Sequence, residues 1–158
     1  MSSKTKLPRK SGVRRRGSAV CVDDGRVLMV RLKDPQTRVE FFSLPGGAID
    51  ENETALQAAI RETREETGYD VCPLENVPPS IARYDFAWDG AIVECETTFY
   101  LCGLVSPHPG VVVAEPTYVL GCEWKPLEEI RSVLSYHEEI RDAVLNLLER
   151  ECAGRQLR

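Results

Sequence analysis

Residues 44–69 constrain the fold of this chain more than any other stretch, because a glycine turn there runs into an acidic helix. The turn is Pro45-Gly46-Gly47, where two glycines permit backbone angles that a side chain would forbid and let another group approach closely. We expect a helix from about Thr54 to Thr67, since this stretch is rich in alanine and Gly68 stands where a left-handed C-cap belongs. Carboxylates are expected to cap its start and match the helix dipole: Asp50, Glu51 and Glu53.

One face of the predicted helix carries three glutamates, Glu62, Glu65 and Glu66, at positions i, i+3 and i+4. Like charges at this spacing repel by about 0.2–0.5 kcal/mol per pair, so the face favours a cation that neutralises it. Carboxylates beside glycine carbonyls suit a hard divalent ion, and Mg²⁺ is usual where a substrate brings phosphate oxygens. A solvated acidic face neutralised by Arg61 and Arg64 is the alternative. Another face is expected to pack into the domain: Leu56, Ile60, Thr63 and Thr67.

The spacing of glycines and charges resembles the Nudix box of the Nudix hydrolases. Every glycine and charged position of that motif is filled: Gly47, Glu53, Arg61, Glu62, Arg64, Glu65, Glu66 and Gly68. Two positions depart from the family pattern, which usually has an aliphatic residue where Thr63 and Tyr69 stand. Both lie on the packing side, so the chemistry of the box is unaffected. The resemblance covers residues 17–152 and favours the cation-binding interpretation.

Length and composition predict one folded domain. At 158 residues, 42% of them hydrophobic and 28% charged, the chain can bury a single core and is neither disordered nor fibrous. The sequence has no apolar run of bilayer length and no signal segment at its start, so we expect a cytoplasmic protein. Six cysteines without a C-x-x-C pair and two histidines in unlike contexts argue against a disulfide framework or a zinc site.

Residues 1–16 hold seven basic side chains and no acidic one. Subtracting this charge of +7 from the formal net charge of −5 leaves −12 for residues 17–158, which argues against specific nucleic-acid binding by the folded part. We predict a basic mobile N-terminal arm over residues 1–16, a Nudix hydrolase domain over 17–152 and a C-terminal tail over 153–158. The expected partner is a small-molecule nucleotide and not a membrane, and a homodimer is left open.

The remaining pattern predicts strands around the acidic helix. Asp23-Asp24-Gly25 is expected to turn a hairpin, residues 70–79 a proline-marked loop, and residues 111–120 are undecided, with a loop that could move over the site as one option. Strands are predicted over residues 18–22, 26–32, 39–44, 81–87, 91–105 and 121–125. Further helices are predicted over residues 126–130 and 137–152. This order indicates an α/β fold of the α+β type, and the resemblance implies a Nudix-like α/β/α sandwich with a mixed β-sheet between helices.

The resemblance implies an enzyme that hydrolyses the pyrophosphate linkage of a nucleoside diphosphate linked to another moiety, with Mg²⁺ as cofactor and Mn²⁺ as an alternative. A pyrophosphate repels hydroxide, so such an enzyme neutralises phosphate oxygens, activates a water and holds the attack in line. On the family pattern Glu62, Glu65 and Glu66 are catalytic and bind the metal, with a carbonyl of Gly46 or Gly47 completing the shell. Supporting roles fall to Gly47, Glu53, Arg61 and Gly68, with Arg61 reaching Glu65 at i+4.

Substrate contacts and the general base are less constrained by the sequence. Tyr84 stands 16 residues beyond Gly68, as a tyrosine tends to in dinucleoside polyphosphate hydrolases, which favours such a substrate over a modified nucleoside triphosphate. Arg31 is a candidate phosphate contact, with a solvated strand-end arginine as the alternative. A general base from outside the box is left open among Glu94, Glu96, Glu115 and Glu123. The alternative function is a non-catalytic Nudix-like module that binds a nucleotide or a partner.

Overall fold

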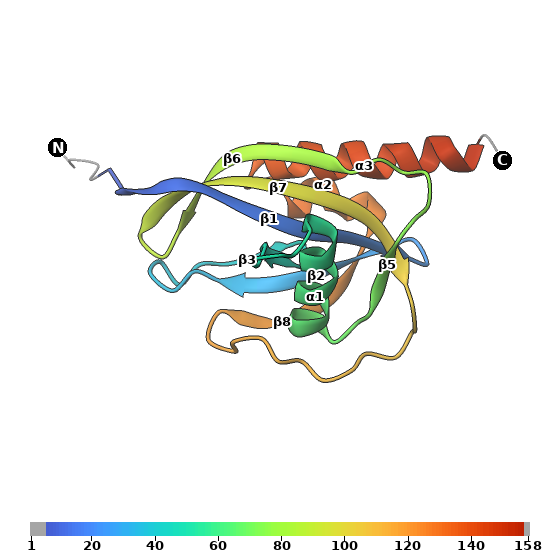
Figure 1. Cartoon of the computed structure of the whole chain (residues 1–158), viewed down its shortest axis with the longest axis horizontal. Helices are drawn as coiled ribbons and strands as arrows, with labels where there is room; N and C mark the ends of the chain where they lie inside the picture. The colour runs from blue at the N-terminus through green and yellow to red at the C-terminus, as the bar shows by residue number, and fades with distance from the viewer. Residues whose placement is uncertain (1–5, 157–158) are drawn as a thin grey trace.

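The computed structural model describes the backbone of residues 6–156 and the side chains of residues 6–151 (Figure 1). More described residues lie in strands than in helices, and the acidic helix stands between the fourth and fifth strands. The elements in chain order are β1 (Arg9–Asp23), β2 (Arg26–Lys33), β3 (Glu40–Ser43), β4 (Gly46–Ala48), α1 (Ala55–Thr67), β5 (Val71–Pro73), β6 (Ser80–Trp88), β7 (Ala91–Leu104), β8 (Val119–Pro126), the 3₁₀ turn η1 (Leu127–Glu129), α2 (Ile130–Val133) and α3 (Glu138–Gln156).

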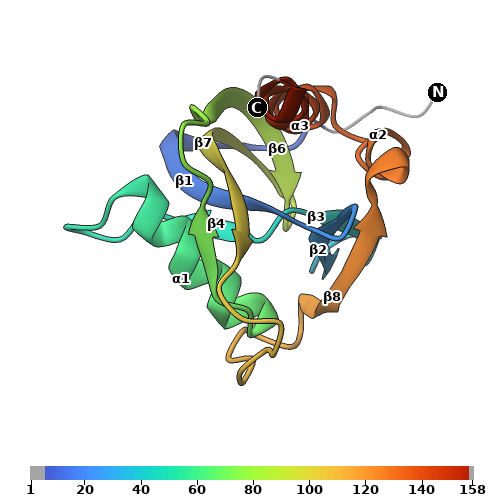
Figure 2. The ribbon, with the colours of Figure 1, turned by 90° about the vertical axis from the view of Figure 1, so that its right-hand side faces the viewer.

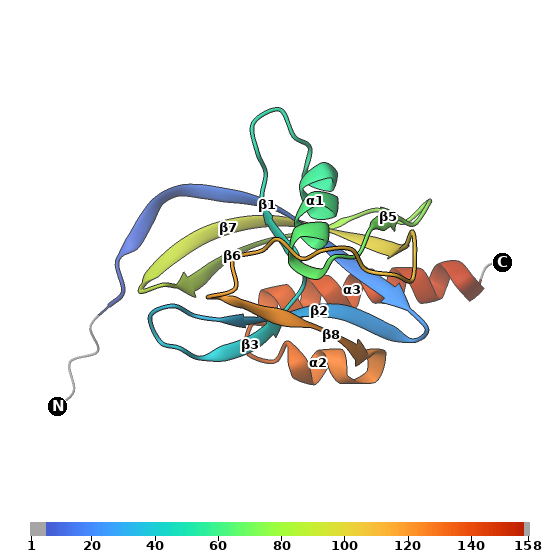
Figure 3. The ribbon, with the colours of Figure 1, turned by 90° about the horizontal axis from the view of Figure 1, so that it is seen from below.

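The strands form a mixed sheet with the main order β3-β2-β1-β7-β5, to which β4 adds on β1, β6 on β7 and β8 on β2. Within residues 6–156, β1 and β7 are the one parallel pair, and the other pairs are antiparallel. β1 pairs with β2 only at the hairpin end, through Val22 and Asp23. Toward its N-terminus β1 pairs instead with β4 and β7, so the β2-β3-β8 group diverges from the β1-β7-β6 group (Figure 3).

Helices cover the sheet from different sides (Figure 2). α1 packs on β1 and β4, whereas α3 packs on β6 and β7 and is joined by α2. Two apolar cores result, one built around Phe99, Leu101 and the inner face of α3, the other around Ala59, Val71 and Leu28 below α1. The expected α/β/α sandwich with a mixed sheet is therefore confirmed. None of the described helices combines the length and apolarity needed to cross a membrane.

The acidic helix has the predicted extent but a different N-cap. The side chain of Thr54 accepts the Gln57 N–H and the side chain of Gln57 accepts the Thr54 N–H, which together form a capping box. The first turn contains no acidic residue, so the prediction that the Asp50–Glu53 carboxylates cap the helix was wrong. At the other end Gly68 is the C-cap, with φ of 80°, as predicted.

The packing face of α1 is also displaced from the predicted one. Thr63 and Thr67 are buried as expected, but Leu56 and Ile60 are only half-buried and Ala58, Ala59 and Glu66 take their place in the interior. The buried face of α1 is made largely of small residues because the helix lies in close contact with β1. A Cβ added to Gly17 would lie 2.0 Å from the carbonyl oxygen of Ala55 in the first helical turn.

Both predicted ends of the domain need correction. β1 begins at Arg9, so residues 9–16 form the first half of a strand that pairs with β7 and are not part of a mobile arm. Arg9 also forms an ion pair with Asp85 at 2.8 Å. The arm positions 1–5 lie outside the described residues. α3 continues to Gln156, so residues 153–156 of the predicted tail are helical, and residues 157–158 lie outside the description.

Two short strands were missed by the sequence pattern. β4 coincides with the glycines expected to form a turn, and β5 lies at the start of the expected loop over residues 70–79. The hairpin and the long central strand β7 lie where they were predicted. The helix predicted over residues 126–130 is the 3₁₀ turn η1, which α2 continues to Val133, and α3 begins within one residue of its predicted start. In the undecided segment, residues 111–120, no helix or strand is assigned before β8 begins at Val119. The amides of Val113 and Ala114 donate to the Glu65 carbonyl oxygen at 2.9 Å.

Candidate active site

A cavity of about 320 Å³ lies between the two diverging strand groups. One wall of it is acidic and comes from α1 and β4: Glu62, Glu66 and Gly46. Arg14 and Arg16 from β1 also line the cavity. Residues 46–48 pair with residues 16–18, so the register of β4 on β1 brings the acidic helix and the two arginines to the same space.

Aromatic side chains line much of the rest of the cavity. Tyr84, Phe86 and Trp88 alternate along β6 and therefore face the same side of the sheet. Tyr118, just before β8, meets Trp88 edge to face with ring centroids 6.0 Å apart. The Tyr84 hydroxyl is fixed by a 2.7 Å hydrogen bond with Thr97 and accepts a 3.3 Å bond from Arg16. The structure thus places the predicted Tyr84 in the cavity, on a rigid strand.

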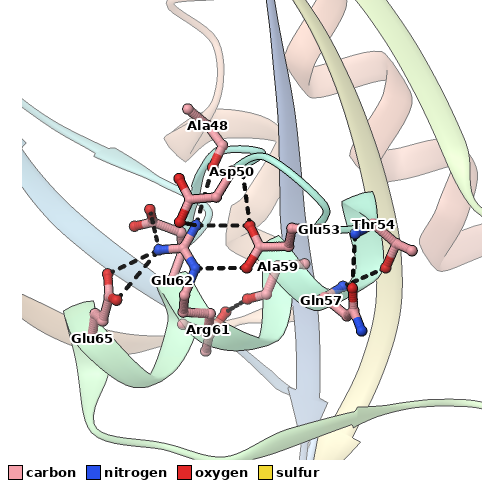
Figure 4. A network of polar contacts seen from close by, with 10 residues as sticks. Ala48, Asp50, Glu53, Thr54, Gln57, Ala59, Arg61, Glu62 and Glu65 are labelled. Carbon is pink, nitrogen blue, oxygen red and sulfur yellow. Dashed lines mark hydrogen bonds and ion pairs between the residues drawn. The ribbon is translucent and has the colours of Figure 1, made fainter.

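Arg61 organises the outer side of the acidic helix (Figure 4). Its Nε and Nη2 donate to the two oxygens of Glu53 at 2.8 and 3.0 Å, and Nη2 also donates to the Ala48 carbonyl oxygen at 3.1 Å. Its Nη1 donates to Glu62 at 2.9 Å and to both oxygens of Glu65 at 3.3 Å, which includes the predicted i+4 contact. One guanidinium therefore ties the helix to the loop before it and draws two carboxylates toward one positive centre.

The two outer acidic residues of this network differ in environment. Hydrogen bonds from Arg61 and from the Asp50 N–H lower the pKa of Glu53 to about 2. Glu65 does not line the cavity, and 37% of its side chain is exposed on the outer side of α1. Glu65 therefore lies outside the cavity that Glu62 and Glu66 line, although it shares the Arg61 contact with Glu62.

Glu66 is the most deeply buried carboxylate of the box. It accepts the Gly46 N–H at 2.8 Å, and its burial raises its pKa to about 8 because desolvation outweighs that hydrogen bond. Burial also raises the pKa of Glu62, although Arg61 opposes the shift. A carboxyl group that titrates near neutral pH inside a cavity is suited to exchange protons with a bound molecule.

The two glycines of the turn are required for different reasons. A Cβ on Gly47 would lie 2.4 Å from the carboxyl carbon of Glu62, so only glycine lets this carboxylate lie against β4. A Cβ on Gly46 would meet the carbonyl oxygen of Gly17 at 2.6 Å, so only glycine permits this close contact with β1. Both glycines therefore fix the position of the acidic wall relative to the sheet.

Other predicted site residues lie away from the cavity. Arg31 is exposed near Glu40 at 3.9 Å and does not line it, because alternation along β2 turns Leu32 inward instead. None of the four candidate general bases outside the box lines it either. Two are paired elsewhere, Glu96 with Arg83 at 2.6 Å and Glu123 with Lys125 at 3.0 Å. The acidic groups that do line the cavity are Glu62 and Glu66.

The donor chemistry around Glu62 fits a hard cation. Glu62 and Glu65 already converge on a single positive group, the Nη1 of Arg61. Within the described part of the chain, no three His, Cys, Asp or Glu side chains surround one point as metal ligands do. Mg²⁺ usually binds through one or two carboxylates together with waters and substrate phosphates, so a complete protein cage is not required.

The raised pKa of Glu66 predicts how stability depends on pH. In the folded state the Glu66 carboxyl group keeps its proton up to about pH 8, whereas in the unfolded chain it loses the proton near pH 4.5. The stabilisation that comes from this protonated carboxyl group is therefore complete below pH 4.5 and is lost as the pH rises to 8. In EDTA, the free energy of unfolding of the wild type should fall relative to Glu66→Gln by up to about 1.4 kcal/mol per pH unit between pH 5 and 8. Urea titrations measure the free energy of unfolding of both proteins. If the wild type and Glu66→Gln show parallel pH profiles, the raised pKa of Glu66 is wrong.

Glu53→Gln should loosen the loop that Arg61 ties to α1. The substitution keeps the size of the side chain but removes the charge that two Arg61 nitrogens contact. We expect a loss of about 1 kcal/mol in the free energy of unfolding, since this pair is partly exposed. Glu51→Gln, at a neighbouring exposed position, is the matched control and should change stability by less than about 0.5 kcal/mol. Equal urea midpoints for the two variants would disprove the role of the contact.

Comparison with known proteins agrees with this geometry. Residues 13–148 match the NUDIX domain family, and the chain therefore belongs to the Nudix family. It is also 36% identical over 103 residues to MutT4 of Mycobacterium tuberculosis, an alignment that covers 64% of this chain. The same alignment covers only 39% of that protein.

Solved structures share the fold at low sequence identity. A NUDIX hydrolase from Nitrosomonas europaea superposes with a TM-score of 0.64, 23% identity and 90% coverage of each chain. An Ap4A hydrolase from C. elegans superposes with a TM-score of 0.65 and 20% identity, over 89% of this chain and 98% of that one. These similarities confirm the architecture; the chemistry of this chain depends on its own cavity.

Proposed function

We propose that this chain is a Mg²⁺-dependent pyrophosphohydrolase that cleaves a nucleoside diphosphate linked to another moiety. The observation that supports it most directly is that Glu62 and Glu66 of the family box lie in one cavity with arginine and aromatic side chains. Acidic, basic and aromatic groups together suit a metal ion, a phosphate chain and a nucleobase. Tyr84 in the cavity favours a dinucleoside polyphosphate, with a modified nucleoside triphosphate as the second substrate class.

The metal would be held by Glu62 and Glu66, with the Gly46 carbonyl, and by Glu65 once that side chain leaves Arg61. When bound, Mg²⁺ would neutralise phosphate oxygens and lower the pKa of a water, and Mn²⁺ would serve similarly. Arg61 orients Glu62 through the 2.9 Å hydrogen bond, and the Gly46 N–H orients Glu66. Glu66, whose pKa lies near 8, is suited to accept a proton as water attacks phosphorus.

The proposal is tested by a panel of substrates assayed with Mg²⁺, with Mn²⁺ and with excess EDTA. The panel contains dinucleoside polyphosphates, oxidised deoxynucleoside triphosphates, nucleoside diphosphate sugars and ADP-ribose. We expect turnover of at least one phosphate-rich member with metal, loss of it in EDTA, and higher activity at alkaline than at acid pH, because metal binding and water activation both require lost protons. Full activity in EDTA would contradict the mechanism, and no turnover on any member would indicate a non-catalytic binding module.

A further inference from the structure

Three neighbouring strands present three different kinds of side chain to the cavity side of the sheet. The register aligns Arg14 with Cys95 and Arg16 with Thr97 on β7, and aligns Cys95 with Tyr84 on β6. β1 therefore contributes arginines, β7 contributes small side chains, and β6 contributes aromatic ones. Since neighbouring strands lie about 4.8 Å apart, the arginine column and the aromatic column are separated by about 10 Å across β7.

The arginine column carries positive charge that the protein does not neutralise by direct contact. Within residues 6–151, neither Arg14 nor Arg16 forms an ion pair with a carboxylate. Arg16 is held only by neutral hydroxyl groups, Tyr84 at 3.3 Å and Thr97 at 3.4 Å, so its guanidinium is oriented but keeps its charge available. Arg14 is exposed at the mouth of the same cavity. Two guanidinium groups that line one cavity, one of them oriented by hydrogen bonds, favour a phosphate group as ligand.

The aromatic column offers a surface of the opposite kind. Trp88 is half-buried and Tyr118 is 38% exposed, so both rings keep area free for a planar ligand. Cys95 of β7 lies between the two columns and lines the same cavity. The face therefore suits a molecule with a planar apolar end and an anionic end that lies obliquely across β7, since Trp88 pairs with Ala91 and Arg14 pairs with Cys95; a nucleotide carrying phosphates fits this description.

We propose that Arg14 and Arg16 bind a phosphate of the substrate, apart from the carboxylates of α1, and that the nucleobase lies against Trp88 and Tyr118, so that the nucleotide spans β7. This inference rests on the proposed function and makes it more specific. It predicts that affinity rises with the number of phosphates, because a longer phosphate chain can reach the arginines as well as the carboxylates of α1. A nucleotide whose second moiety is an uncharged sugar should gain less affinity.

Binding without turnover tests the arginines. Inorganic tripolyphosphate and ADP are titrated in EDTA against the wild-type protein, Arg14→Gln, Arg16→Gln and Arg15→Gln. Arg15 is the matched control, because it lies on the same strand but does not line the cavity. We expect Arg14→Gln and Arg16→Gln each to lower the affinity for both probes by about tenfold. Arg15→Gln should weaken them by no more than about twofold, since exposed charges are screened.

The aromatic end is tested by Trp88→Ala and Tyr118→Ala in the same titrations. Each variant should bind ADP about tenfold more weakly and bind tripolyphosphate with unchanged affinity, because only ADP carries a base. Melting temperatures identify any variant that fails to fold, and Arg14→Gln, which removes an exposed side chain without hydrogen-bond partners, keeps the test valid if Arg16→Gln does fail. The proposal would be overturned if Arg14→Gln and Arg15→Gln bound the probes with equal affinity. It would also be overturned if the aromatic variants lost affinity for ADP and tripolyphosphate equally.

The same measurements separate this inference from the proposed function. If the wild-type protein binds tripolyphosphate through the arginines but hydrolyses nothing with Mg²⁺, the phosphate site stands and the enzymatic function fails. If the wild type hydrolyses a nucleotide while Arg14→Gln and Arg16→Gln leave its KM and the probe affinities unchanged, the function stands and the phosphate site is wrong.

Discussion

Replacing Glu66 with glutamine is expected to lower kcat by about 10²-fold or more, equivalent to about 2.7 kcal/mol of barrier or more. Glutamine keeps the length of the side chain and can still accept the Gly46 N–H, but it removes the negative charge that would hold a metal and accept a proton. The fold should not suffer, because glutamine has the size of the buried Glu66 carboxyl group and stays neutral at every pH. The measurement is a steady-state assay on the best substrate of the panel, with urea titrations on the same samples.

Two further variants make the Glu66 result interpretable. Glu62→Gln should lose activity comparably, since Glu62 also lines the cavity. Glu75→Gln, which neutralises an exposed glutamate away from the cavity, should leave kcat within about twofold. If Glu62→Gln and Glu66→Gln both retain wild-type kcat, the acidic wall is not the catalytic site.

Gly17→Ala should cause the largest loss of stability, about 3 kcal/mol or more in the free energy of unfolding. The new Cβ would lie 2.0 Å from the Ala55 carbonyl oxygen and 3.0 Å from the Ala59 amide nitrogen, which are backbone atoms of α1 and cannot rotate away. The helix must therefore shift as a unit. Because α1 carries Glu62 and Glu66, activity should fall together with stability.

Gly103→Ala is the control for Gly17→Ala. Gly103 lies on β7, and its added Cβ would meet only a flexible side-chain atom of Leu74 at 3.4 Å. We expect a change of less than about 1 kcal/mol there. Urea midpoints measure both variants, and a Gly17→Ala protein as stable as Gly103→Ala would show that the close helix contact is not needed.

The acidic helix and its C-cap could be predicted because both depend on local rules. Residue spacing places three glutamates on one helical face, and Gly68 adopts the left-handed conformation that ends the helix. The buried stripe of α1 could not be predicted by the same means. Leu56 is larger and more apolar than Ala58, but the approach of the helix to Gly17 allows only small side chains between them.

The arginines of the cavity were missed for a different physical reason. A run of basic residues at a chain end indicates a solvated arm when it is read alone. Its strand conformation depends on β7, whose residues lie far away in the sequence. The alternation of Arg14 and Arg16 was a signal for one strand face, but only the register on Cys95 and Thr97 identifies that face as the cavity.

The parallel pairing of β1 with β7 also determines the order in which the molecule can assemble. Val13 pairs with Glu94 and Cys21 pairs with Cys102, so each contact closes a loop of about 80 residues. Such distant contacts slow folding. During synthesis β1 remains unpaired with β7 until β7 has left the ribosome. Arg14 and Arg16, the first cavity-lining side chains to be synthesised, thus reach their final positions only after β7 has been made.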